Sequence, residues 1–330
     1  MADYLASSFK IYQEYLKTRA AETLQQQADV FNAAVNNAIV MRTVEKPGDY
    51  EYESFFKDIA GLVSRRDNTS TSSASKLSMA QEEFIRVKLS RKIGPVDMAR
   101  DAFRKWMGKY SETEFSGLLG QQIAVGQQLD MVNTALLATR AALVTNNSGS
   151  LLYTVPSNGS VITTSLVDGL SKMGDRADRV VAWIMHSKPY FDLTKNQITS
   201  NITGVSNFNV QTGTPITLNR PVLVTDSASL KITSGSPAVT DYYTLGLTAN
   251  GALVEVTETN DVVVQDVTGL EVLMTRLQGE FAYNLGVKGF KYDVTSGGAN
   301  PNATAVGTGT NWDKASTDDK SLAGIVIKSR

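Results

Sequence analysis

The sequence predicts an α+β protein, and three features lead to that class. A stretch from Ser111 to about Val144 has apolar residues at helical spacing. The residues after it are rich in Thr, Val, Gly, Ser and Asn, a composition typical of strands and turns. Before it, residues 44–93 combine strand-like alternation with a polar run, which indicates an extended excursion from the folded body.

The first forty-odd residues are predicted to form one helix, because apolar residues recur every three to four positions from Leu5 to Ile39. Such a helix either packs on its own domain or forms an arm that docks on a neighbouring subunit, and the sequence leaves both open. Pro47-Gly48 ends the pattern.

The excursion is predicted to be two strands joined by a loop. Residues Asp49 to Glu53 alternate aromatic and acidic side chains, as an exposed strand does. Asp67 to Ser75 is polar throughout, which favours a flexible loop tip. Phe84 to Ile93 interleaves apolar and basic residues, which predicts a return strand with a basic face. We expect residues 44–93 to lie outside the core.

Basic residues are concentrated between Arg86 and Lys109, where the local charge balance is +6. They are Arg86, Lys88, Arg91, Lys92, Arg100, Arg104, Lys105 and Lys109. They form either a solvated face or a patch for an acidic neighbouring subunit or an enclosed polyanion.

The long helix begins with the capping-box pattern Ser111-Glu-Thr-Glu114. Its apolar stripe continues to Leu143. At 1.5 Å per residue it would run about 50 Å, longer than a compact domain normally needs. This length predicts a thin, plate-like subunit with a helical spine.

The second half is predicted to alternate short strands with helices. Strands are expected at 151–155, 180–185, 221–225, 242–247, 253–256, 262–264 and 283–292, and helices at 166–173 and 189–196. Asn158-Gly159 and Asn250-Gly251 are tight-turn signals of the hairpin type.

Composition excludes several function classes. The chain has 330 residues, a net charge of −1, one histidine and no cysteine. Disulfides, thiolate metal sites and a cysteine nucleophile are therefore excluded, and no global positive field draws the chain onto DNA. The N-terminus lacks a secretory pattern and no run of about 18 apolar residues occurs, so we expect a cytoplasmic protein until something larger carries it out.

Catalytic motifs are not found. His186 and Ser187 are adjacent at the end of an apolar strand, where neighbouring side chains point to opposite faces and cannot form a nucleophile–base pair. The carboxylate pairs Glu82-Glu83, Glu112/Glu114 and Asp318-Asp319 are interpreted as surface charge, and Gly307-Thr-Gly309 as a flexible loop. We therefore assign no catalytic, cofactor-binding or metal-ligating residue and expect no enzyme activity and no cofactor.

The order of these pieces resembles the major capsid proteins of tailed bacteriophages, whose shell fold is of the Hong Kong ninety-seven type. Arg179 to Leu193 looks like the strand and helix that begin the axial domain, and Asn219 to Ser227 is similar to its next strand. Gly279 to Asp293, with Asn311-Trp312 and Lys320 to Ile327, looks like the closing peripheral strands. The resemblance implies an N-terminal arm (1–43), an E-loop (44–93), a peripheral domain with the spine helix (94–160), an axial domain (161–265) and peripheral return strands (266–330).

The resemblance implies a shell protein. Such a chain assembles with itself as pentamers and hexamers into the icosahedral head around double-stranded DNA, with scaffolding, portal and decoration proteins as further partners and only weak, non-specific DNA contact. It would be assembled in the host bacterial cytoplasm and located in the virion, with no membrane contact. An encapsulin-like nanocompartment shell is one alternative, and a β-rich carbohydrate-binding or hydrolytic protein is another.

Overall fold

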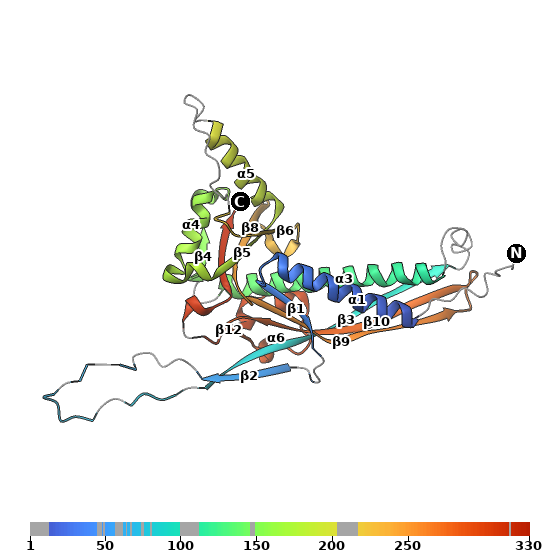
Figure 1. Cartoon of the computed structure of the whole chain (residues 1–330), viewed down its shortest axis with the longest axis horizontal. Coiled ribbons are helices and arrows are strands. Elements are labelled where there is room, and N and C mark those ends of the chain that lie inside the picture. The colour runs from blue at the N-terminus through green and yellow to red at the C-terminus, as the bar shows by residue number, and fades with distance from the viewer. Residues whose placement is uncertain are drawn as a thin grey trace.

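The computed structural model describes residues 13–44, 48, 50–56, 62–63, 65–66, 68–73, 76–79, 81–99, 112–145, 149–202, 217–316 and 318–330. These residues form two main sheets and a small two-stranded sheet, with helices packed against them (Figure 1). The predicted α+β class is confirmed. In the described part of the chain, no helix combines the length and apolar character needed to cross a membrane.

The first sheet has the order β1–β9–β10–β3–β2. Its strands are β1 (Ile39–Thr43), β2 (Tyr50–Phe56), β3 (Gln81–Ala99), β9 (Ala252–Val267) and β10 (Met274–Val287). β1 is parallel to β9, and the other neighbours are antiparallel. Because β10 pairs with both β9 and β3 as far as Met274, the sheet extends on one side as a long three-stranded ribbon.

Two helices, α1 (Gln13–Ala34) and α3 (Glu112–Thr145), lie side by side and pack on the first sheet (Figure 1). α1 buries Leu16, Ala20 and Leu24. A Cβ on Gly120 of α3 would lie 2.8 Å from the Leu16 carbonyl oxygen, so glycine permits this close approach. The long helix is confirmed, and the described part of the N-terminal helix packs on its own domain.

The N-terminal helix ends earlier than predicted. It stops at Ala34, and Ile39 begins β1. Asn36 and Asn37 adopt left-handed φ angles of 51° and 56°, which asparagine tolerates better than most residues. The single helix predicted through Ile39 is therefore wrong at its end, because Ile39 is buried by the strand.

The second sheet has the order β4–β13–β8–β5–β6, with β7 beside β8. Its strands are β4 (Leu152–Thr154), β5 (Val180–Met185), β6 (Val222–Val224), β7 (Lys231–Ser234), β8 (Val239–Thr248) and β13 (Gly324–Ser329). Helices α4 (Thr163–Ser171) and α5 (Ser187–Ile202) and the 3₁₀ turns η3 (Pro156–Asn158), η4 (Gly174–Arg179) and η5 (Ala228–Leu230) accompany it. Trp183, Leu245 and Ile325 are fully buried in its core.

The remaining elements are β11 (Phe290–Tyr292), α6 (Val294–Gly297), α7 (Ala303–Val306), η6 (Gly309–Asn311), β12 (Trp312–Lys314) and η7 (Asp319–Ser321). Gly307 ends α7, and a Cβ on Gly309 would lie 1.9 Å from the Thr145 hydroxyl oxygen of α3. The flexible loop predicted at Gly307-Thr-Gly309 is therefore wrong, because these glycines allow close packing on the spine helix.

Most strands and helices of the second half form where the sequence predicts them, β5 with the predicted limits. Three predictions are corrected. The strands expected at 253–256 and 262–264 are one strand, β9, and the strand expected at 283–292 divides at Gly289, where φ is 82°. Asn158-Gly159 lies at a 3₁₀ turn before α4 and not in a hairpin.

Asn250-Gly251 does form a turn, with Asn250 at φ 57°, but the turn connects β8 of the second sheet to β9 of the first. The predicted hairpin there is wrong. β13, expected among the peripheral strands, pairs with β4 and β8 in the second sheet. The chain thus passes from the second sheet to the first at Gly251 and returns to the second sheet before Gly324. The expected domain boundaries 161–265 and 266–330 therefore do not coincide with the limits of the two sheets.

β2 and β3 form a hairpin that projects from the body (Figure 1). Its pairs run from Tyr50↔Val87 at the body to Phe56↔Gln81 at the outer end. Val87 and Leu89 on β3 are fully buried. The expectation that all of 44–93 lies outside the core is therefore wrong for the inner half of β3, which belongs to the first sheet.

Candidate interaction surfaces

The hairpin and its loop present large apolar side chains to solvent. We define the hairpin surface as Tyr52, Phe56, Leu62, Val63, Leu77 and Met79. Val63 is 93% exposed, and the other five are all more than half exposed. An apolar group of this size on a projecting element is typical of a contact with another molecule.

A second apolar group lies at the opposite end of the first sheet. It comprises Val96 on β3, Val263 on β9, and Leu270, Val272 and Leu273 in the β9–β10 connection. The two groups project on opposite sides of the body (Figure 1). A molecule with contact surfaces at both ends is suited to meet neighbours on both sides.

Three basic residues of the return strand pair with carboxylates within the chain, whereas Lys92 is exposed. The Arg86 guanidinium lies 3.0 Å from a Glu51 carboxylate oxygen, Lys88 pairs with Glu258, and the Arg91 Nε lies 3.0 Å from Asp130. Residues Arg100 to Lys109 lie outside the described residues. For Arg86, Lys88 and Arg91, neither a solvated face nor a patch for an acidic neighbouring subunit or an enclosed polyanion is correct.

Arg91 belongs to a partly buried network with Asp130 and Tyr283. The Tyr283 hydroxyl donates to Asp130 over 2.9 Å. Burial, assisted by the Asp130 charge, raises the pKa of Tyr283 to about 12. The tyrosine therefore stays protonated and joins α3 to β10 as a structural contact.

His186 and Ser187 do meet, contrary to the prediction. The His186 Nδ1 lies 3.3 Å from the Ser187 hydroxyl and 3.6 Å from Asp226. The chain leaves the extended conformation at Ser187, where α5 begins, so the two side chains no longer point to opposite faces.

This group lacks the geometry of a nucleophile–base pair. The His186 Nδ1 accepts the Lys188 amide, and a hydrogen bond from Ser187 lowers the pKa of Asp226. The Ser187 hydroxyl therefore donates a hydrogen bond to the Asp226 carboxylate, and the His186 Nδ1 accepts one from the Lys188 amide of the helix. The residues cap α5 rather than prepare a nucleophile.

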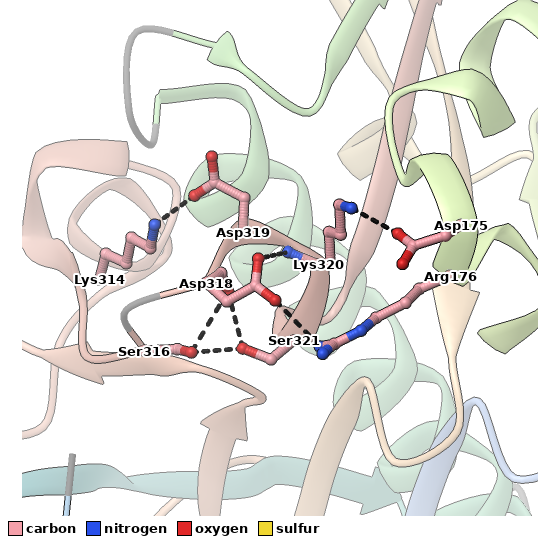
Figure 2. Close-up of polar contacts among 8 residues, drawn as sticks. All are labelled: Asp175, Arg176, Lys314, Ser316, Asp318, Asp319, Lys320 and Ser321. Carbon is pink, nitrogen blue, oxygen red and sulfur yellow. Dashed lines mark hydrogen bonds and ion pairs between the residues drawn. The ribbon is translucent and has the colours of Figure 1, made fainter. Parts of the chain in front are cut away.

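The acidic pair Asp318-Asp319 is part of an ionic clasp and not free surface charge (Figure 2). Asp318 lies 3.0 Å from the Arg176 guanidinium, Asp319 pairs with Lys314, and Lys320 pairs with Asp175. We call these six residues the clasp. It fastens the segment before β13 to η4.

The other predicted carboxylate pairs also lack acid–base geometry. Glu82 pairs with Lys291 at 2.9 Å, whereas Glu83 and Glu114 are exposed. The Glu112 side chain lies outside the described residues. No group of three or more His, Asp or Glu residues suited to a metal ion occurs in the described part.

A cavity of about 330 Å³ lies at the base of the hairpin. It is lined by Val40, Arg42, Glu53, Phe84, Arg86, Asn250, Leu253, Gly286, Val287, Lys288, Gly289 and Phe290. A carboxylate oxygen of Glu53, the acidic residue of the lining, lies 2.6 Å from the Arg86 guanidinium. Glu53 therefore forms a structural ion pair and is not placed as a catalytic base.

The comparisons with known proteins agree with a protein that acts through contacts of its surface with other molecules. The family model described as major capsid protein 13-like matches residues 8–326. No curated protein matches the chain significantly. The capsid structure of Ralstonia phage GP4 is 11% identical, with a TM-score of 0.50 over 89% of this chain and 87% of that chain.

Two further phage structures are similar. The Cyanophage Pam1 capsid is 10% identical, covering 100% of this chain and 99% of that chain with a TM-score of 0.49. The Mycobacterium phage Bobi structure is 13% identical, covering 89% and 90% with a TM-score of 0.48. The fold shared with the Ralstonia phage capsid agrees with the Hong Kong ninety-seven type expected from the sequence. Since the family model spans nearly the whole chain, the chain belongs to the major capsid protein 13-like family.

Proposed function

We propose that the protein assembles with copies of itself, as pentamers and hexamers, into the icosahedral head shell that encloses the double-stranded DNA genome of a tailed bacteriophage. The hairpin surface carries this proposal, because six large apolar side chains on a projecting element need a partner to cover them. In a closed shell, every subunit supplies both the projecting element and the surface that receives it.

The proposal gives each part of the chain a task. The described part of the arm (1–43) packs on its own subunit, and the projecting part of the E-loop (44–93) lies across a neighbour. The first sheet with α3 forms the peripheral domain, which includes β9 in addition to residues of the expected ranges 94–160 and 266–330. The second sheet forms the axial domain, which takes β4 and β13 from outside the expected range 161–265 and whose loops meet at the symmetry axes.

The remaining roles follow from charge and chemistry. A net charge of −1 favours weak, non-specific contact with packaged DNA, which would not hinder genome release. The capped histidine and the paired carboxylates favour a structural, non-enzymatic role. Scaffolding, portal and decoration proteins complete the set of partners, with assembly in the host bacterial cytoplasm.

Light scattering and negative-stain microscopy of the purified protein test this function. Closed particles are expected, and particles isolated from infected cells should contain DNA, which separates a phage head from a nanocompartment. Deleting residues 67–75 should leave a folded subunit but spoil closed shells. A chain that stays monomeric at all concentrations and ionic strengths would overturn the proposal.

A further inference from the structure

A row of charged side chains crosses the whole width of the first sheet at the base of the hairpin. Arg86 on β3 contacts Glu51 at 3.0 Å and Glu53 at 2.6 Å, both on β2. In the other direction it reaches Glu255 on β9 at 3.5 Å. Glu255 is fully buried and also accepts from the Arg42 Nε of β1 over 2.7 Å.

Arg86 reaches β9 because the strand between them carries a glycine. Gly286 of β10 lies one residue beyond Leu285↔Val87, the last pair between β10 and β3. A Cβ on Gly286 would lie 3.0 Å from Cγ of Arg86. The arginine side chain therefore lies across β10 where a larger residue would obstruct it.

The hairpin needs such a brace because its pairing alone does not fix its direction. In the sheet order β2 is an edge strand that pairs only with β3. The Leu285↔Val87 pair is the last between β10 and β3, so Gln81 to Arg86 pair with β2 alone in the ladder. Two-stranded ribbons twist more than wider sheets, so side-chain contacts decide their angle.

Among the described residues, another ion pair reaches the projecting part of the hairpin from the body. Lys291 of β11 contacts Glu82 at 2.9 Å, which holds β3 alone. Arg86, in contrast, joins both hairpin strands to a buried carboxylate on a third strand. A guanidinium can do this because its five donors form a planar fork, which a lysine ammonium lacks.

We propose that Arg86 is the positioning residue that fixes the direction of the β2–β3 hairpin against the first sheet, with Glu255 as its anchor, and that this direction is required for shell closure. The second half of this statement rests on the proposed function. The row contains three carboxylates and two guanidinium groups. Replacing Arg86 by glutamine leaves three carboxylates with one guanidinium. Repulsion between the carboxylates would then push β2 away from the rest of the first sheet.

The direction of the hairpin can be measured in unassembled subunits. Because the chain has no cysteine, Gln81→Cys and Thr304→Cys provide two unique sites for spin labels, one on the hairpin and one on the body. The distance distribution between them is compared in the parent, Arg86→Gln, Arg86→Lys and Glu255→Gln proteins. Arg276→Gln is the matched control, since it breaks the Arg276–Asp97 pair, which joins β10 to β3 far from the hairpin.

The distribution should broaden and its maximum shift in Arg86→Gln and Glu255→Gln. Combining the two should add little, because they act through one contact. Arg86→Lys should be intermediate, and Arg276→Gln unchanged. Without the labels, Arg86→Gln should give open or irregular particles where Arg276→Gln gives closed ones.

An unchanged distribution in Arg86→Gln overturns the positioning role. A broadened distribution with normal particles overturns the link to closure. If the parent chain forms no particles, the proposed function fails, while the distances still decide the positioning role. If Arg86→Gln does not fold, Arg86→Lys decides on the same criteria.

Discussion

His186 lies where β5 ends and α5 begins, and its surroundings keep the ring neutral. Burial lowers the pKa of His186, the Asp226 carboxylate opposes this, and Lys231 adds to the lowering. Tyr242 packs against the ring with centroids 5.1 Å apart. Since the folded pKa lies below the unfolded value, stability from this group is complete above about pH 6.5 and is lost as the pH falls below it.

The histidine can be followed alone, because the chain has no other. Its NMR titration should give a pKa below about 6.5, and Asp226→Asn should lower that pKa further by removing the opposing charge. Urea unfolding should show less loss of stability in His186→Gln than in the parent between about pH 7 and about pH 5.5. A titration midpoint at or above about 6.5 would contradict the assignment.

Two glycines are expected to respond oppositely to a single added methyl group. A Cβ on Gly246 would lie 2.6 Å from the Trp183 ring, so Gly246→Ala should cost about 1–3 kcal/mol through overpacking. Gly126 is exposed on α3 with no neighbouring atom within 4 Å, so Gly126→Ala should stabilise the helix by about 1 kcal/mol. Urea midpoints of unassembled subunits measure both, and equal effects would refute this account.

At the scale of the element, the clasp fastens the segment between β12 and β13 to η4. The chain passes from β12 to the second sheet through η7. The Asp318 carboxylate both pairs with Arg176 and accepts the Lys320 amide over 3.0 Å (Figure 2). One residue therefore supplies an ion pair and a cap, which substitutions can separate.

Asp318→Asn keeps the capping oxygen and loses the charge, whereas Asp318→Ala loses both. Arg176→Gln and Asp318→Asn should each cost at most about 1 kcal/mol, because the pair is partly exposed and screened by salt. Asp318→Ala should cost about 1 kcal/mol more. Hydrogen exchange at residues 320–323 measures the difference, and equal exchange in Asp318→Asn and Asp318→Ala would show that the cap contributes nothing.

The elements that the sequence predicts well are those whose signal is local. The long helix follows from its apolar stripe, and β5 from a continuous apolar run, since all the determining residues are close in the chain. The pairing of Arg86 with Glu255 and of Lys88 with Glu258 could not be predicted, because each joins residues about 170 positions apart. The His186–Ser187 contact was missed for the opposite reason, since it depends on the backbone angle at the start of α5.

At the scale of the whole molecule, the described ion pairs and apolar side chains have different locations. Arg86, Lys88 and Arg91 form ion pairs with carboxylates of the same chain. The large apolar side chains of the hairpin surface, in contrast, are exposed and are not part of the buried core cluster. These three basic residues are therefore paired within the subunit, whereas the exposed apolar side chains of the hairpin surface remain available for contact with another molecule.

This division predicts that a charge on the hairpin surface separates folding from assembly. Val63 is 93% exposed, so Val63→Asp should leave the circular dichroism and the urea midpoint of the subunit unchanged. Burying a valine is worth about 1.5–3 kcal/mol, and that loss recurs at every copy of the contact, so closed particles should disappear. Ser70→Asp adds the same charge to an exposed polar residue of the same loop and should still give particles. Equal particle yields from the two variants in sedimentation and microscopy would show that the hairpin surface does not join subunits.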